Sequence, residues 1–205
     1  MTSMHARWLT LITAGLLVAC GPRPYAPRNG DIVFQTSLSP QSLAIQRATH
    51  SRYSHVGIVY LEAGTPYVYE AVQPVGRRSL AEWIASGEDG HVVVKRLRDA
   101  NHLLTPATLS KMKAEGERFQ GKDYDNTFEW SDDRLYCSEL VWKIYQRGVG
   151  VEIGRPQRLG DLDLTDPEVQ AKVQERWGGS PPLEEMVISP GALFDSKELV
   201  TVYSR

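Results

Sequence analysis

The chain has 205 residues, with 23 Lys and Arg against 25 Asp and Glu, which gives a formal net charge of −2. A charge so close to balance creates no strong field toward nucleic acid or anionic lipid, so we expect no nucleic-acid partner. About 185 residues follow the N-terminal targeting segment. That length is enough for one domain with a sizeable core.

The first twenty residues have the layout of a bacterial lipoprotein signal. Arg7 supplies a positive charge, residues 8–19 form an apolar run, and Cys20 follows directly. The run is shorter than the roughly 20 apolar residues that a membrane-spanning helix needs. We therefore expect cleavage before Cys20, acylation with a chain such as palmitate, and anchoring in a membrane of the cell envelope. The outer membrane is favoured, with the domain facing the periplasm; the alternative is an ordinary secretory signal.

Composition divides the chain into three parts. Residues 1–19 are the predicted signal peptide, and residues 20–29 are Pro-rich and polar, which is typical of a tether between a lipid and a domain. Residues 30–205 show no repeat and no low-complexity tract. We expect them to form a single catalytic domain.

The predicted elements are five strands and six helices. β-branched and aromatic runs predict strands at 31–35, 55–61, 67–72, 91–97 and 199–203. Capping residues and Pro or Gly punctuation predict helices from Ser39-Pro40, over 79–86, from Thr105-Pro106 to 119 with Gly121 as the C-cap, over 137–146 with Gly148 as the stop, over 166–177 and from Ser189-Pro190. Strands and helices are segregated rather than alternating. This order favours an α+β fold with an antiparallel sheet packed against helices.

Two adjacent strands carry a histidine and an acid that we expect to face each other. A loop over 62–65 pairs Leu61 with Pro66 and places Gly57 opposite Glu70. His55 is then two residues further along on the same face, within reach of a long side chain. A carboxylate in that position holds one ring nitrogen and stabilises the imidazolium. The alternative is a half-buried strand histidine with an incidental acid beside it.

Cys137 stands at the start of the predicted 137–146 helix. The other cysteine is Cys20, so after lipidation Cys137 has no partner for a disulfide. A helix N-terminus stabilises a thiolate, and its free N–H groups can donate hydrogen bonds to an oxyanion. The alternative is a small buried hydrophobe that begins a core helix. Together with His55 and Glu70, Cys137 indicates a cysteine hydrolase.

Other kinds of catalytic site find little support. The sequence has no His-Glu-x-x-His motif, no cysteine pair for zinc and no acidic calcium loop, so we expect no metal and no cofactor. It also lacks the Gly-x-Ser-x-Gly elbow of serine hydrolases.

Several motifs together resemble the permuted NlpC/P60 papain-like cysteine hydrolases, specifically the YiiX/YebB-like group. They are Gly30-Asp31-Ile32-Val33-Phe34-Gln35, Ser54-His55-Val56-Gly57, Tyr69-Glu70-Ala71-Val72, Tyr136-Cys137-Ser138-Glu139-Leu140-Val141, Pro182-Leu183-Glu184-Glu185 and Ser189-Pro190. The chain has the order His, acid, Cys of this group. The resemblance implies a circularly permuted papain-like fold, with Cys137 as nucleophile, His55 as general base and Glu70 as its orienting residue.

The resemblance also implies an oxyanion and substrate side formed by Tyr124 and Ser138. The alternative for Tyr124 is an aromatic residue that only packs. One departure concerns the substrate. Ordinary members have Asp before the cysteine and Gly two residues after it, whereas this chain has Tyr136 and Glu139. That difference weakens the expectation that the enzyme cuts D-glutamyl–diaminopimelate bonds.

Three functions remain open. The first is a cysteine amidase or endopeptidase that acts on an amide bond of a cell-wall peptide or a related envelope substrate. The second is a lipid-directed thioesterase or acyltransferase, which membrane anchoring and the aromatic residues Tyr124, Trp130 and Trp142 suit. The third is a non-catalytic envelope lipoprotein, which would have no need of Cys137, His55 and Glu70 together.

Overall fold

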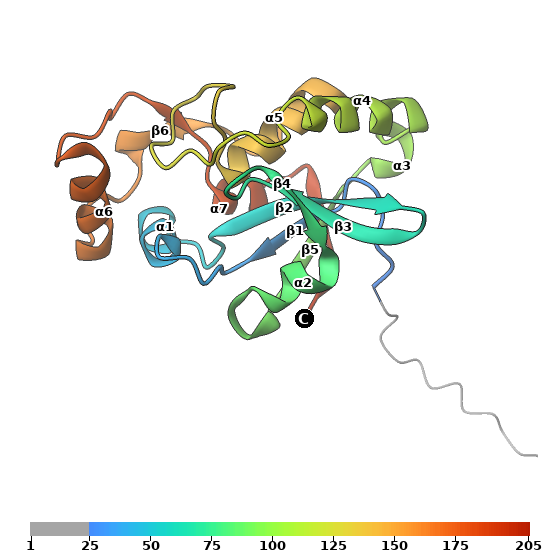
Figure 1. Ribbon diagram of the computed structural model, residues 1–205, viewed down its shortest axis with the longest axis horizontal. Helices are drawn as coiled ribbons and strands as arrows, with labels where there is room; N and C mark the ends of the chain where they lie inside the picture. Colours follow the sequence, from blue (N-terminus) through green and yellow to red (C-terminus); the bar gives the residue numbers. More distant parts are fainter. Residues whose placement is uncertain (1–24) are drawn as a thin grey trace, which may run out of the picture.

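The structure is a computed structural model that describes residues 25–205 (Figure 1). The predicted signal peptide and Cys20 lie outside the described residues. One antiparallel sheet has the strand order β4-β3-β2-β1-β5-β8. Its strands are β1 (Ile32–Gln35), β2 (His55–Glu62), β3 (Thr65–Glu70), β4 (Gly76–Ser79), β5 (Val93–Leu97) and β8 (Leu199–Ser204), and a separate pair joins β6 (Gln157–Arg158) to β7 (Met186–Val187).

The helices surround this sheet. They are α1 (Ser42–Thr49), α2 (Leu80–Ala85), α3 (Ala100–Leu103), α4 (Pro106–Glu117), α5 (Cys137–Val149), α6 (Pro167–Trp177) and α7 (Pro190–Phe194), with 3-10 turns at Glu88–Gly90 and Leu159–Asp161. The predicted α+β class with an antiparallel sheet is confirmed. Among residues 25–205, none of the helices has both the length and the apolar character that crossing a membrane would require.

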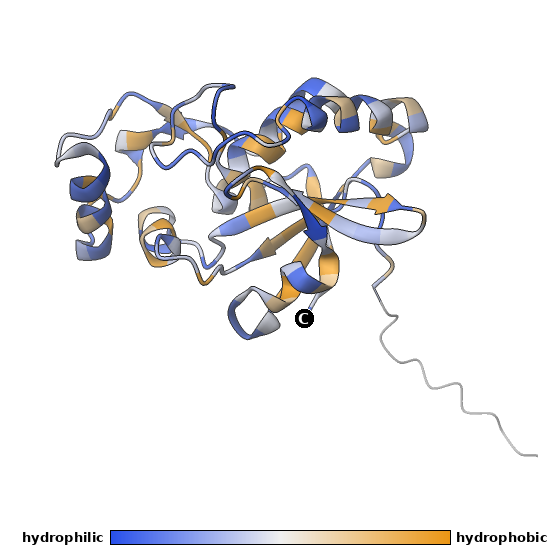
Figure 2. Ribbon diagram, in the orientation of Figure 1, coloured by the Kyte–Doolittle hydropathy of each residue, from blue (hydrophilic) through white to orange (hydrophobic). Residues whose placement is uncertain are grey.

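The hydrophobic core has layers on both faces of the sheet. Helix α5 packs on one face, where Leu140, Val141 and Ile144 are fully buried, and α2 packs on the other through Leu80 and Trp83 (Figure 1). Figure 2 shows the apolar residues concentrated along the strands and on the inward side of α5. Each fully buried aliphatic side chain contributes about 1.5–3 kcal/mol. Their packing fixes the N-terminus of α5 relative to the sheet.

A smaller apolar cluster lies beside the main core. Helices α1 and α6 meet there, with Ala44, Ala48 and Val169 buried between them and Leu162, Leu164 and Val173 packed against them. In Figure 1 these two helices stand together at one end of the molecule, away from α3 and α4. This pair forms a wall of the cavity described below.

The hairpin register that was predicted from the sequence is confirmed. Leu61 pairs with Pro66, and the pairing continues to Ile58 opposite Tyr69, which places Gly57 opposite Glu70. The loop is shorter than predicted, because Glu62 and Thr65 also pair. Ala63 and Gly64, with φ of 49° and 84°, make the left-handed turn that closes such hairpins. His55 and Glu70 therefore lie on one face.

Three predicted helix boundaries were wrong. Helix α1 begins two residues after Pro40, because residues 39–42 form a turn in which the Ser42 N–H donates to the Ser39 carbonyl. Helix α4 is capped at Arg118 instead of Gly121. Helix α5 runs past Gly148 to Gly150, the left-handed C-cap. A Cβ at Gly148 would lie 2.8 Å from Met112 Cα, so this glycine allows α4 and α5 to pack closely instead of ending the helix.

Two further differences concern the edges of the domain. Strand β4 was not predicted, because its sequence Gly-Arg-Arg-Ser has no apolar alternation. Residues 25–29, which we assigned to the tether, contact the domain. Tyr25 stacks on Tyr203 and donates to Asp31, and the Asn29 side chain accepts from the Leu61 N–H. The folded part of the chain therefore reaches back at least to Tyr25.

Candidate active site

The structure brings His55 and Glu70 into direct contact. His55 Nε2 lies 2.5 Å from Glu70 Oε2, and both residues are buried, with 8% and 1% of their surfaces exposed. The contact follows from the hairpin register, because residues two apart on paired strands lie on one face. A carboxylate on Nε2 leaves the other ring nitrogen for a second partner.

Two more side chains hold the Glu70 carboxylate. Trp83 Nε1 donates to Glu70 Oε2 at 2.9 Å, and the Arg78 guanidinium contacts both carboxylate oxygens, with Nε 2.5 Å from Oε1. The Trp83 indole also stacks on the His55 ring, with 5.9 Å between centroids. Trp83 and Arg78 were not identified from the sequence. They come from α2 and from β4, the strand that was not predicted.

The pKa values of the pair shift apart. Burial lowers the pKa of His55, but interactions with the Cys137 side chain and the Glu70 carboxylate outweigh it and raise that pKa to about 9. Burial raises the pKa of Glu70, and His55 and Arg78 together bring it below its ordinary value. At neutral pH the site therefore holds an imidazolium beside a carboxylate.

Cys137 is the first residue of α5 and is buried against the core. Its first-turn N–H groups have no carbonyl four residues earlier in the helix to bond, so they remain available to an anion. The apolar stripe of α5 holds this end of the helix against the sheet. Cys137, His55 and Glu70, which lie far apart in the sequence, thus meet in one place.

Tyr124 lies beside the cysteine. Burial raises the pKa of its hydroxyl well above the ordinary range, and the neighbouring Cys137 thiol adds to that rise. Its hydroxyl accepts a hydrogen bond of 2.9 Å from Gln41 Nε2. Gln41, the residue before α1, was not singled out from the sequence, where no local pattern marks it.

The other residues around Cys137 have structural contacts. The Ser138 hydroxyl donates to the Ile188 carbonyl at 2.7 Å, so its proton is already bonded to the main chain. The Tyr136 hydroxyl accepts from the Ile188 N–H. Glu139 is fully buried beside Lys143, 2.7 Å away, and burial raises its pKa to about 8. Glu139 is therefore part of the helix packing and does not face a bound substrate.

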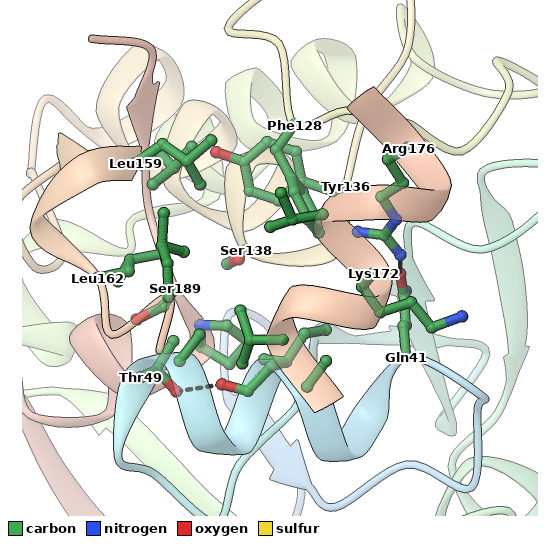
Figure 3. A pocket seen from close by; sticks show the side chains of 18 of the residues that line it. Gln41, Thr49, Phe128, Tyr136, Ser138, Leu159, Leu162, Lys172, Arg176 and Ser189 are labelled. Carbon is green, nitrogen blue, oxygen red and sulfur yellow. Dashed lines mark hydrogen bonds between the residues drawn. The ribbon is translucent and has the colours of Figure 1, made fainter. Parts of the chain in front are cut away.

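An apolar cavity opens next to Cys137 (Figure 3). Its volume is about 710 Å³, including space open to solvent at its mouth. Cys137, Tyr136 and Ser138 line one side, and α1, α6 and residues 159–164 line the rest. The apolar residues of this wall include Ala44, Ala48, Leu162, Leu164, Val169 and Val173.

A second hollow, with more polar walls, lies on the His55 side. It has a volume of about 800 Å³, including space open to solvent, and is lined by His55, by Leu38, Ala71 and Val72, and by several polar side chains: Gln35, Ser37, Ser39, Ser54, Gln73 and Arg78. Gln41 and Tyr124 line both spaces. We call the two spaces the apolar cavity and the polar hollow. The reacting groups lie where they meet.

Comparison with known proteins gives consistent results. A family model described as "Permuted papain-like amidase enzyme, YaeF/YiiX, C92 family" matches residues 26–203. The chain is 47% identical over 192 residues to the protein "Uncharacterized protein YiiX" of Escherichia coli strain K12, and the match covers 94% of each chain.

A solved structure shares the fold. It is described as the crystal structure of metalloprotein yiiX from Escherichia coli O157:H7, with a TM-score of 0.84, 49% identity and coverage of 88% of this chain and 99% of that one. Within residues 25–205, no three His, Cys, Asp or Glu side chains are grouped as metal ligands. By the extent of these matches, the chain belongs to the permuted papain-like amidase family C92, and at the level of that family it is a cysteine amidase or peptidase.

Proposed function

We propose that this protein hydrolyses an amide bond whose acyl part is a long apolar chain, with Cys137 as nucleophile, His55 as acid and base, and Glu70 as the residue that orients His55. The observation that carries the proposal is the apolar cavity, because Cys137 itself forms part of its wall. An acyl chain seated there presents its carbonyl carbon to the thiolate.

The chemistry follows from the two sides of the site. The Cys137 thiolate attacks the carbonyl carbon, and the oxyanion that forms faces the N-terminus of α5. The His55 imidazolium then donates its proton to the leaving amine as the C–N bond breaks, which leaves an acyl-enzyme. Water, activated by neutral His55, releases the acid. Because the proton comes from His55, the leaving amine lies in the polar hollow, whose hydroxyl and amide groups suit a polar amine.

A cell-wall peptide fits this site less well. Its acyl side is a polar, charged peptide, and the cavity wall offers mainly aliphatic and aromatic side chains to it. Burying polar groups without hydrogen-bond partners costs about 1–3 kcal/mol each. The departures at Tyr136 and Glu139 point the same way. The hydroxyl of Tyr136 is bonded to Ile188, and Glu139 is buried beside Lys143.

The test is a series of N-acyl aminocoumarin amides with acyl chains of two, six and twelve carbons. Each added methylene contributes at most ~0.8 kcal/mol, so kcat/KM should rise up to about fourfold per methylene until the cavity is full. Ala48→Trp and Val173→Trp fill the cavity and should remove the preference for long chains. Leu103→Trp, on α3 and far from the cavity, is the control. Equal rates for all chain lengths, with cleavage of stem peptides, would overturn the proposal in favour of a peptidase.

The location is a separate proposal. The apolar run at residues 8–19 and the cysteine that follows it support a lipid anchor at Cys20. An anchored domain would meet acylated substrates in the same bilayer. The outer membrane and a periplasm-facing domain remain the proposed location.

A further inference from the structure

A chain of three side chains leads from α6 to the nucleophile. Arg176 NH2 donates to Gln41 Oε1 at 2.5 Å, and Gln41 Nε2 donates to the Tyr124 hydroxyl at 2.9 Å. Tyr124 lies beside Cys137. Figure 3 shows the Arg176 guanidinium directed from α6 toward Gln41. The three residues belong to three separate segments, and none of these contacts is local in the sequence.

Arg176 decides which way the Gln41 amide points. A guanidinium has only donors, so the amide oxygen must face it. The amide nitrogen must then face Tyr124, because the two ends of a primary amide are opposite. Within residues 25–205, no ion pair joins Arg176 to a carboxylate; its other close neighbour is the Phe128 ring, 4.9 Å from the guanidinium carbon. The Arg176 guanidinium thus donates its side-chain hydrogen bond to Gln41.

The direction of the Gln41 amide sets the direction of the Tyr124 proton. A tyrosine hydroxyl has one proton and can also accept. Since its oxygen accepts from Gln41, the proton is free to point elsewhere, and Cys137 is the polar group beside it. Burial keeps this hydroxyl protonated, since it raises its pKa well above the ordinary range.

We propose that Gln41 and Arg176 are positioning residues, which hold Tyr124 as a hydrogen-bond donor to the oxyanion formed when Cys137 attacks the substrate carbonyl. The inference rests on the proposed thiol mechanism. In that step the S–C bond forms, the π electrons of the carbonyl move to its oxygen, and the Tyr124 O–H donates to that oxygen without transferring its proton. Collapse of the intermediate returns the electrons to the carbonyl and expels the amine, which takes its proton from His55.

The sharpest variant is Gln41→Glu. A carboxylate still accepts from Arg176, and as an ion pair it keeps α6 in place. It cannot donate to Tyr124. Instead it accepts the Tyr124 proton and turns it away from the oxyanion. The variant therefore keeps the shape of the site and reverses one hydrogen bond.

The assay uses p-nitrophenyl acetate, whose acetyl group does not need the long cavity. Loss of one oxyanion donor costs about 10²–10³ in kcat, so Tyr124→Phe should lower kcat at least 100-fold with little change in KM. Gln41→Glu should lower kcat nearly as much. In the double variant with Tyr124→Phe, the Gln41 change should have no further effect, because it acts through the hydroxyl. Arg176→Met should lower kcat about tenfold, and Arg176→Lys, which keeps a donor, should restore most of the loss.

The possible outcomes separate this inference from the proposed function. If Gln41→Glu still lowered kcat in the Tyr124→Phe background, or changed KM alone, Gln41 would not act by positioning Tyr124. The thiol mechanism would be unaffected by that result. If the Cys137→Ala variant hydrolysed p-nitrophenyl acetate as fast as wild type, both the inference and the thiol mechanism would be overturned. A melting temperature within about 3 °C of wild type in each variant would show that the losses are not due to unfolding.

Discussion

Replacement of Glu70 by Gln is the most direct test of how the histidine is held. The carboxylate receives hydrogen bonds from His55, Trp83 and the Arg78 NH2 group, and all three groups donate. Gln keeps the shape of the side chain but offers one acceptor oxygen and one NH₂ group. If the amide oxygen takes the position near His55 and Trp83, the NH₂ group faces Arg78 Nε, a donor, at 2.5 Å in the wild type.

The expected cost has two parts. Breaking a buried ion pair by removing one charge costs about 3–5 kcal/mol. Arg78 is one-third exposed, so water partly replaces the lost partner, and we expect about 2 kcal/mol of destabilisation. The larger effect is on turnover. Without the carboxylate, neither the tautomer nor the imidazolium of His55 is stabilised, and we expect a loss of at least about 10²-fold, by analogy with orienting residues of catalytic triads.

The assay is the steady-state hydrolysis of p-nitrophenyl acetate, together with urea unfolding of the same preparations. Trp83→Phe is the matched control, because it removes one donor to Glu70 but keeps the charge and the aromatic stack on His55. We expect that control to lose less than tenfold in turnover. If Glu70→Gln kept more than a third of wild-type turnover while Cys137→Ala abolished it, Glu70 would not be the residue that orients His55.

Three further predictions follow from single residues. The pKa of His55 in the folded protein, about 9, lies above its ordinary value of 6.5. The protonated ring therefore contributes stability that is fully present below pH 6.5 and is lost as the pH rises through about 9. In urea unfolding, the stability advantage of wild type over His55→Gln should shrink across that pH range by on the order of 3 kcal/mol. Iodoacetamide should label Cys137 at pH 6 far faster than a model thiol, and labelling at the model rate would contradict an activated nucleophile. Cys20→Ser should abolish incorporation of labelled palmitate while the purified domain keeps its melting temperature, whereas a wild type without label would indicate an ordinary secretory signal.

Local patterns in the sequence were sufficient for several parts of the fold. Helix α2 lies within the predicted range 79–86 and is capped by Ser79 and Glu82, and α6 begins at Asp166-Pro167 as predicted. The hairpin register follows from the alternation of side chains along two strands and from a short loop between them. These features depend on residues a few positions apart, so the sequence contains all the information that they need.

Boundaries were predicted less well where packing overrides a local signal. Gly148 is a helix breaker by propensity, yet α5 continues through it because the contact with Met112 requires a residue without a Cβ. Glu139 is an acidic residue in the first turn of α5, yet it is fully buried beside Lys143. In both cases the physical reason is a contact with a residue outside the local pattern, and the local pattern does not predict that contact.

The sequence by itself determined the types of most elements, the register that pairs His55 with Glu70, and the placement of Cys137 at a helix start. Only the tertiary structure decided what surrounds that cysteine. The Gln41–Tyr124 and Arg176–Gln41 hydrogen bonds join residues 83 and 135 positions apart, and the cavity wall comes from α1, α6 and residues 159–164. Such contacts arise when the apolar faces of two elements pack against each other. The hydrophobic periodicity of the sequence shows that a face must be buried, but it does not show which segment packs against it.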